Sequence, residues 1–216
     1  MYSIGLRLDG RPCLVAGGGQ VAARKVRSLL EAGAAVTLVA PEVVPPLAAL
    51  AAEGRIRWLV RQAEAEIFAQ LEARPLLVFC ATDDAAVNEA FGRAAGQVGA
   101  LVNDAASPEL CDFFVPAAIR EGELLVTVST GGASPALSRV LKRRIAAFLG
   151  RGWGEWIARL LRLRQRAKER LADSRTREAF WRGALSDRVL DLVEDGEIDK
   201  AEAEVKNEID RFGTQS

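Results

Sequence analysis

The sequence predicts an α/β fold, with an N-terminal Rossmann domain on a parallel sheet, a central segment and a C-terminal all-helical domain. Between Pro12 and about Asn103, short apolar runs alternate with helical patterns, as they do where crossover helices join parallel strands. A glycine-rich turn follows the first run, and strand patterns stop near Gly150. We therefore expect three parts, residues 1–112, 113–149 and 150–216.

Five apolar runs are predicted strands: CLVA, VTLVA, IRWLV, LLVFCA and ALVN. The crossover helices between them are predicted near residues 20–33, 44–53, 64–72 and 84–98. Next, FFVPAAI precedes a strand ELLVTVST, and GGASP leads into a helix from Pro135. We expect these later strands to serve a homodimer, so residues 113–149 are the predicted dimerisation segment with a connecting helix. The remaining residues are predicted helices, separated near Asp173, Gly183 and Gly196.

The composition is that of a soluble globular protein. Half of the 216 residues are hydrophobic, 27% are charged and the formal net charge is zero, so the total charge does not demand nucleic acid. The N-terminus lacks a secretory signal pattern, and no apolar run is long enough to span a membrane. We expect a cytoplasmic protein with no nucleic-acid or membrane partner.

The chain contains no histidine, which excludes Ser-His-Asp and Cys-His catalysis and removes the commonest transition-metal ligand. Its three cysteines, Cys13, Cys80 and Cys111, are too widely separated for a CxxC pair, so we expect core thiols. No metal site is expected from these residues.

The stretch CLVAGGGQVAARK runs in the order strand, glycine turn, helix, which is the context of a dinucleotide site. Gly17 permits the tight turn, Gly19 lets the backbone approach a pyrophosphate, and Ala22 lets the helix pack closely on the strand. The free N–H groups at the helix start receive the anion. Gly18 completes the turn, and the predicted cofactor is a nicotinamide dinucleotide.

The end of the second predicted strand decides between NAD and NADP. The usual acidic residue for the adenosine ribose is missing there, because the strand runs into Ala40 and Pro41, and Glu42 is the nearest substitute. No basic residue stands at this tip to receive a 2′-phosphate, which favours NAD. Arg24 and Lys25, one turn into the first helix, count against that preference.

Two further strand ends carry polar residues. After the fourth strand, Ala81, Thr82 and Asp83 are placed to line the cofactor, although Thr82 or Asp83 equally well caps the next helix. After the fifth strand, Asp104 beside Asn103 is the best-placed titratable group. A carboxylate there either moves a proton or forms a turn.

Charge is unevenly distributed along the chain. There are 14 basic and 4 acidic residues from Arg139 to Arg182, but 4 basic and 10 acidic from Gly183 onward. One predicted helix carries a stripe of arginines, either a solvated face or a clamp for a polyanion or a partner's acidic surface. The stripe consists of Arg159, Arg162, Arg166 and Arg170.

The segments GGGQVAARK, LLEAGAAVTLVAP, CATDDAAVN, CDFFVPAAI and VSTGGASPALSRVLK together resemble the siroheme synthase family, specifically its precorrin-2 dehydrogenases. The resemblance runs from Met1 to about Leu149. It implies NAD-dependent oxidation of precorrin-2 to sirohydrochlorin in a homodimer. In some members it also implies insertion of ferrous iron to make siroheme.

The resemblance also implies roles for single residues. Gln20, Val21, Pro41 and Glu42 match positions where the family holds NAD. Similar proteins place a key aspartate three residues after the asparagine of the fifth strand, where this chain has Ala106. Either Asp104 supplies that carboxylate from two residues earlier, or the oxidation needs no such base.

The substrate that the resemblance implies carries many carboxylates, so backbone N–H groups and hydroxyls are expected to contact it. The alternative role for the loop before the helix at Pro135 is a helix cap. The expected substrate contacts are Asn103, Ser129, Thr130, Gly131, Gly132 and Ser134.

Two other classes share the glycine turn. A short-chain dehydrogenase needs a Tyr-x-x-x-Lys motif, which is impossible here because Tyr2 is the only tyrosine. A non-catalytic NAD-sensing module remains an alternative, although it leaves CDFFVPAAI and STGGASP without a role.

Overall fold

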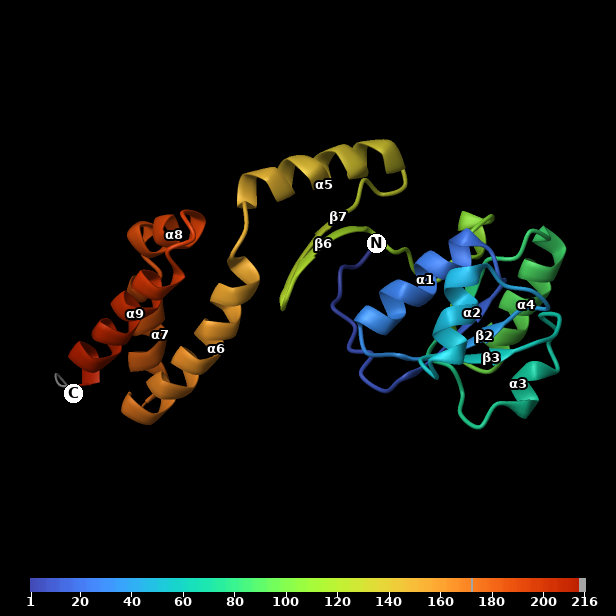
Figure 1. Cartoon of the computed structure of the whole chain (residues 1–216), viewed down its shortest axis with the longest axis horizontal. Coiled ribbons are helices and arrows are strands. Elements are labelled where there is room, and N and C mark those ends of the chain that lie inside the picture. The colour runs from blue at the N-terminus through green and yellow to red at the C-terminus, as the bar shows by residue number, and fades with distance from the viewer. Residues whose placement is uncertain (172, 214–216) are drawn as a thin grey trace. The chain divides into compact units, whose positions relative to one another are not determined.

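The computed structural model describes residues 1–171 and 173–213, which form two compact units, Met1–Val115 and Pro116–Ser216 (Figure 1). The first is the predicted α/β unit, and the second contains a β-hairpin followed by helices. In the described part of the chain, no helix combines the length and apolar character needed to cross a membrane.

The first unit contains the predicted five-stranded parallel sheet, in the order β3-β2-β1-β4-β5. The strands are β1 Pro12–Ala16, β2 Ala35–Val39, β3 Arg57–Leu59, β4 Leu77–Cys80 and β5 Leu101–Asp104. The order reverses direction after β1, because β2 and β3 lie on one side of it and β4 and β5 on the other. Parallel α/β sheets bind their ligands at such a switch point, beyond the carboxyl ends of the strands.

Four helices cross over between the strands, as predicted. They are α1 Gln20–Glu31, α2 Pro45–Ala52, α3 Ile67–Gln70 and α4 Ala85–Gln97, and a 3₁₀ turn, η1, spans Pro108–Leu110. Helix α3 is shorter than the predicted 64–72, because the backbone at Leu71 is extended.

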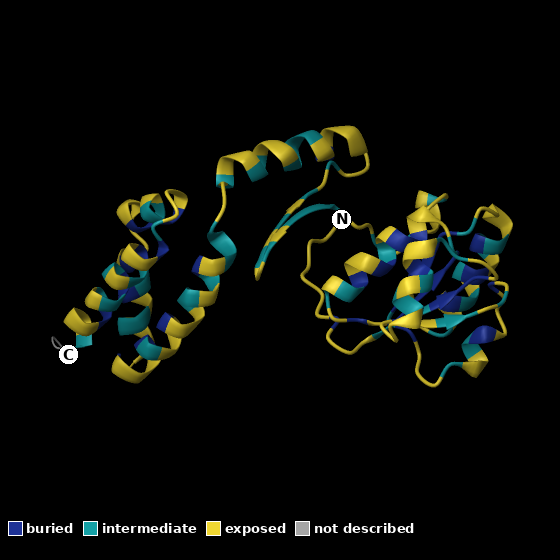
Figure 2. Cartoon of the chain, viewed as in Figure 1, coloured by how far each residue is buried: buried dark blue, intermediate teal, exposed yellow. Residues whose placement is uncertain are grey.

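The sheet is buried on both faces, as Figure 2 shows by the dark blue strands. Successive strand residues point to opposite faces, so β1 contributes Cys13 and Val15 to one core and Leu14 and Ala16 to the other. Helices α1 and α2 cover the first core, and α3 and α4 cover the second. This double cover explains why the strands read as continuous apolar runs.

The second unit begins with an antiparallel hairpin of β6 Ala117–Glu121 and β7 Leu124–Val128, which pairs Ala117 with Val128. Helix α5, Pro135–Leu149, follows and packs against both strands. The predicted strand and helix are confirmed here.

The rest of the second unit is helical, as predicted, and has its own core. The helices are α6 Trp153–Arg170, α7 Ser174–Ala184, α8 Asp187–Glu194 and α9 Ile198–Gly213. Trp156, Leu163 and Phe180 are fully buried at their centre. Asp173 caps α7, because its side chain accepts the N–H of Thr176 at 2.9 Å.

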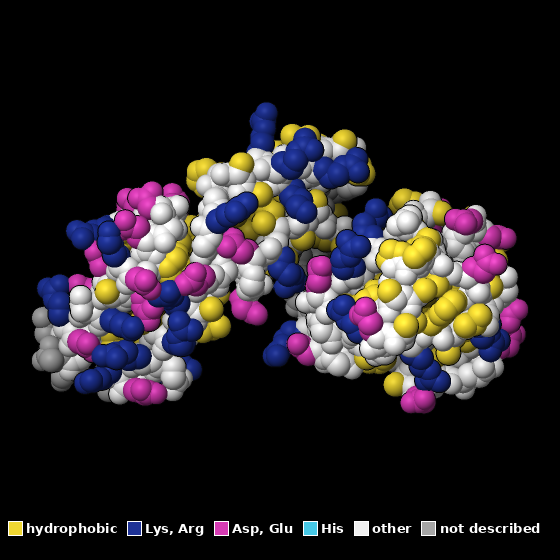
Figure 3. Space-filling view, viewed as in Figure 1, with side chains coloured by type: hydrophobic (Ala, Val, Ile, Leu, Met, Phe, Trp, Pro, Cys, Tyr) yellow, Lys and Arg dark blue, Asp and Glu magenta, His cyan; other side chains and the backbone are white. Residues whose placement is uncertain are grey.

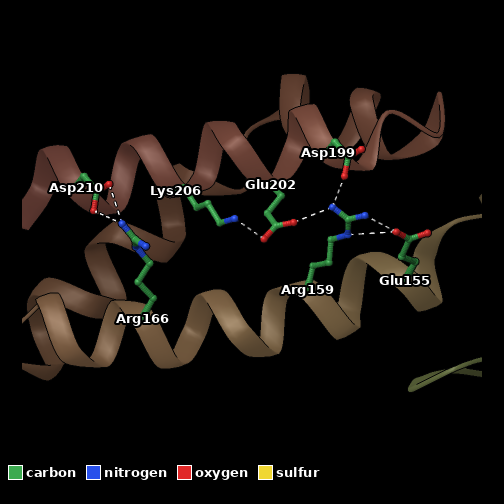
Figure 4. A network of polar contacts seen from close by, with 7 residues as sticks. All are labelled: Glu155, Arg159, Arg166, Asp199, Glu202, Lys206 and Asp210. Carbon is green, nitrogen blue, oxygen red and sulfur yellow. Dashed lines mark hydrogen bonds and ion pairs between the residues drawn. The ribbon is translucent and has the colours of Figure 1, made fainter.

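Part of the arginine stripe on α6 is paired with acidic side chains, so the stripe as a whole is not a solvated face or an open clamp. Arg159 is paired with Glu155 at 2.5 Å on its own helix, and with Asp199 and Glu202 on α9 (Figure 4). Arg166 donates two hydrogen bonds to Asp210, also on α9. The sequence prediction missed this pairing because nothing in the local pattern places α9 beside α6.

Replacing Arg159 by Met is expected to lower the Tm by roughly 2–4 °C, because the carboxylate of Glu202 loses its partner on α6. Hydrogen bonds from Lys206 and Arg159 hold the pKa of Glu202 below its usual 4.5. Since that carboxylate is protonated as the pH falls through its lowered pKa, the effect should shrink as the pH falls below 4.5 and disappear below the lowered pKa.

The measurement is thermal unfolding across pH, with Arg162→Met as the matched control. Arg162 lies on the same helix, is exposed and has no ion pair among those found in residues 1–171 and 173–213. Equal Tm values for the two variants at pH 7 would contradict the pairing.

Candidate dinucleotide-binding site

The glycine turn brings three loops into backbone contact. Gly17 has a φ of +114°, which other residues rarely adopt, and a Cβ there would lie 2.2 Å from the carbonyl oxygen of Ala81. A Cβ on Gly18 would lie 1.8 Å from the carbonyl oxygen of Glu42. The Val44 N–H also donates to the Gly18 oxygen at 2.9 Å. The loops after β1, β2 and β4 therefore meet at one point.

Gly19 faces open space, since a Cβ added there would have no atom within 4 Å beyond its own chain neighbours. It is the N-cap of α1, and no side chain caps its N–H groups. The first N–H groups of a helix have no partner inside the helix. Gln20 and Val21 are exposed, whereas Ala22 is fully buried against the sheet. This arrangement fits a dinucleotide pyrophosphate, as the sequence predicted.

The second loop presents the residues predicted beside the adenosine ribose. Pro41 and Glu42 are exposed, while Ala40 is buried and its carbonyl accepts the indole N–H of Trp58 at 2.9 Å. The backbone contact between Glu42 and Gly18 puts this loop directly beside the glycine turn.

The third loop corrects one prediction. The cap of α4 is Asp84, whose side chain accepts the N–H groups of Ala86 and Val87, and not Thr82 or Asp83. The Thr82 hydroxyl lies 2.7 Å from the side-chain oxygen of Asn88. Asp83 is exposed next to them. Because Asp84 provides the cap, the side chain of Asp83 stays exposed to solvent.

At the end of β5, Asp104 is 5% exposed, and its Oδ1 accepts the N–H groups of Ala106 and Ser107 at 2.7 and 3.1 Å. The turn-forming role is therefore present. Its other oxygen, Oδ2, is buried and has no hydrogen-bond partner in the described part of the chain. Asn103 is also buried, and its side-chain amide donates to the carbonyl of Phe113 at 3.0 Å.

Lys25 does not lie where a residue that favours NADP would lie. Its ammonium does not reach toward the ribose tip of β2, but donates to Asn103 Oδ1 at 3.0 Å and lies 5.0 Å from the ring centre of Phe79. It therefore no longer counts in favour of NADP. Its helical spacing could have indicated burial, because Ala22, Val26 and Leu29 share that side of α1.

The loop predicted to contact substrate belongs to the second unit, and it caps α5. The Ser134 hydroxyl accepts the N–H of Leu137 at 3.1 Å, and the Thr130 hydroxyl accepts the N–H of Ser134 at 3.1 Å. The Gly131 N–H donates to the Ser129 hydroxyl, while Gly131 and Gly132 have no atom within 4 Å of a Cβ position. The cap is thus present, and the glycine backbone stays open.

The cysteines are free thiols. Cys13 and Cys80 are buried, and burial raises the pKa of Cys13 to about 11 and that of Cys80 to about 12. Cys111 is only partly buried, and its sulfur accepts the N–H of Asp104 at 3.2 Å. Cys13 and Cys80 are the predicted core thiols, whereas Cys111 borders the β5 end of the site.

Comparison with known proteins agrees with this geometry. Residues 4–117 match the family described as "Putative NAD(P)-binding", so the first unit is an NAD(P)-binding domain. Residues 122–147 match "Sirohaem biosynthesis protein central", and residues 152–209 match "Sirohaem synthase dimerisation region". The chain belongs to the siroheme synthase family.

Siroheme synthases are among its relatives. That of Methylobacillus flagellatus is 43% identical over 189 residues, which are 86% of this chain and 40% of the relative. That of Methylococcus capsulatus is 40% identical over 197 residues, 91% of this chain and 41% of the relative. The chain thus spans about two fifths of the length of these relatives.

A solved structure covers the chain more completely. SirC, a precorrin-2 dehydrogenase, superimposes with a TM-score of 0.73 at 29% identity, over 94% of this chain and 99% of its own. The α/β fold with a helical C-terminal part is therefore shared along nearly the whole chain.

Replacing Gly19 by Ala is expected to leave the Tm unchanged, because the new methyl group meets no protein atom, and to weaken NAD binding by about tenfold or more. The physical reason is that the methyl group fills the space a pyrophosphate needs. Calorimetric titration with NAD measures this.

Gly96→Ala, a change on α4 that also meets no atom within 4 Å, is the matched control and should bind NAD normally. A Gly19→Ala protein with unchanged NAD affinity would show that the dinucleotide binds elsewhere.

Proposed function

We propose that this chain oxidises precorrin-2 to sirohydrochlorin with NAD. The observation that carries the proposal is the open space at Gly19, at the same sheet edge as the Asp104 carboxylate oxygen that has no partner among the described residues. The likeness to SirC along nearly the full chain supports the substrate class. A hydride acceptor and a proton acceptor are what this oxidation requires.

The proposed NAD contacts come from all three loops. Bound NAD would supply the hydride acceptor. The backbone of Gly17, Gly18 and Gly19 would hold its pyrophosphate with the N–H groups of Gln20 and Val21, while Glu42 receives the ribose hydroxyls. The backbone at Ala40, Pro41, Ala81, Thr82 and Asp83 would border the dinucleotide on either side.

Asp104 would accept the proton that leaves with the hydride. Two backbone N–H groups fix Oδ1, so the carboxylate has a set orientation, and Oδ2 has a lone pair without a donor. A buried oxygen left without a partner is rare in proteins and suggests a role beyond the turn. Asp104 would thus replace the carboxylate that similar proteins have two residues later, where this chain has Ala106.

The second unit has groups that suit the acidic arms of such a substrate. The open backbone at Gly132 offers an N–H group, whereas that of Gly131 already donates to the Ser129 hydroxyl. Lys and Arg side chains gather over α5 in Figure 3, and the sequence from Leu124 to Gly154 contains no acidic residue. Unlike Arg159 on α6, the basic residues of α5 have no ion pair among those of the described residues. They are Arg139, Lys142, Arg143 and Arg144.

The protein would act as a homodimer in the cytoplasm. The sequence placed the dimerisation segment at 113–149, whereas the family region named for dimerisation matches residues 152–209. Residues 116–149 and 152–209 belong to the second unit, and both segments are proposed to contribute to the contact between copies. Insertion of ferrous iron would be a further step of the same site.

Purified protein mixed with precorrin-2 and NAD is expected to produce NADH and sirohydrochlorin in equal amounts, because one hydride leaves for each substrate oxidised. Absorbance of NADH and of sirohydrochlorin measures both products, with and without ferrous iron. NAD binding without NADH production would instead support the NAD-sensing module.

Replacing Asp104 by Asn is expected to lower kcat about 100-fold while the Tm and the NAD Kd stay near those of the unmodified chain. Asn keeps an oxygen that can accept the two N–H bonds from Ala106 and Ser107, but it has no carboxylate. Single-turnover kinetics and thermal unfolding provide the two measurements.

Asp104→Ala is the companion variant, since it loses the turn as well as the carboxylate. If Asp104→Asn turns over normally and only Asp104→Ala is impaired, Asp104 is a turn-forming residue and not the proton acceptor.

A further inference from the structure

Lys25 holds a positive charge at the β5 end of the site without a carboxylate partner. Its ammonium is partly buried and donates to Asn103 Oδ1 at 3.0 Å. No acidic side chain forms an ion pair with it in residues 1–171 and 173–213. Burial, and then the charge of Arg24, lower its pKa from the usual 10.5. Keeping an ammonium group partly buried without a carboxylate partner costs free energy, and the hydrogen bond to Asn103 alone does not explain why the fold accepts this cost.

The Asn103 side chain contacts both Lys25 and the segment that follows η1. Its Nδ2 donates to the Phe113 carbonyl at 3.0 Å and lies 3.6 Å from the Cys111 sulfur. The Phe113 ring packs edge-on against Phe79, at 5.4 Å between centroids, and Phe79 is the ring beneath the Lys25 ammonium. Lys25 thus contacts Asn103 and Phe79, the two residues that hold residues 111–113 against the sheet.

The same segment fixes the backbone of Asp104. The Cys111 sulfur accepts the Asp104 N–H at 3.2 Å and lies 3.2 Å from the Asp104 carbonyl oxygen. One residue further, the Asp112 carboxylate accepts the N–H of Val102 at 2.8 Å. Residues 111 and 112 therefore lie beside β5 and hold the backbone of Val102 and Asp104.

We propose that Lys25 is a positioning residue for the oxidation: through Asn103 and the 111–113 segment it holds the backbone of Asp104 in place at the end of β5. This inference rests on the proposed function. The charged and titratable groups that act on Lys25 are Arg24 on α1 and Cys111 after η1, and Cys111 in turn faces Asp104 and Asp112.

The test replaces Lys25 by Met, which removes the charge and the donor, and by Gln, which removes the charge and keeps a donor. Lys25→Met should lower kcat at least about tenfold with an unchanged NAD Kd, since small displacements of a reacting group are costly. Lys25→Gln, which keeps a donor for Asn103 Oδ1, should retain most of the rate.

Hydrogen exchange gives a readout that needs no turnover. Residues 101–113 should exchange faster in Lys25→Met than in the unmodified chain, while residues 35–39 of β2 exchange as before. Arg24→Met, which removes a neighbouring exposed charge on the same helix, is the matched control and should leave both the exchange and kcat unchanged.

The exchange result separates the two ideas. If the unmodified chain does not oxidise precorrin-2 but Lys25→Met still loosens residues 101–113, the proposed function fails and the positioning contact stands. Unchanged exchange together with an unchanged kcat in Lys25→Met would overturn the role of Lys25. A folded Lys25→Gln protein that is as slow as Lys25→Met would overturn positioning through the hydrogen bond to Asn103.

Discussion

The site depends on the backbone contacts of the glycine turn. Gly17 approaches Ala81, and Gly18 approaches Glu42, so closely that neither position has space for a Cβ. Because β1 lies between β2 and β4, these contacts bring the ends of all three strands to one place. A side chain at either glycine would separate the loops. The opening at Gly19 exists because its two predecessors hold the surrounding loops together.

Strand alternation gives the two polar residues at the end of β5 different surroundings. Asn103 is in register with Phe79, which belongs to the core beneath α1, and Asp104 is in register with Cys80, which belongs to the core beneath α4. Neighbours in a strand face opposite sides of the sheet. One residue therefore meets Lys25, while the other forms the turn that leads out of the strand.

The two basic helices of the second unit differ in how their charge is compensated. On α6, the guanidinium groups of Arg159 and Arg166 are paired with carboxylates of α9, so the acidic C-terminal sequence neutralises part of the basic block within one unit. Helix α5 packs against both strands of the hairpin, and the sequence from Leu124 to Gly154 contains no acidic residue. Sequence counts alone did not reveal this difference, because the pairing of α6 depends on its contact with α9.

The sequence by itself determined the element order, the five parallel strands, the glycine turn and the family, because apolar periodicity and turn residues act over a few neighbouring positions. Only the tertiary structure decided what depends on distant contacts. Asp84 caps α4 instead of Thr82 or Asp83, the arginines of α6 pair with α9, and Lys25 turns toward Asn103. Each of these choices depends on which side chain another element brings within hydrogen-bonding distance, and local sequence does not contain that distance.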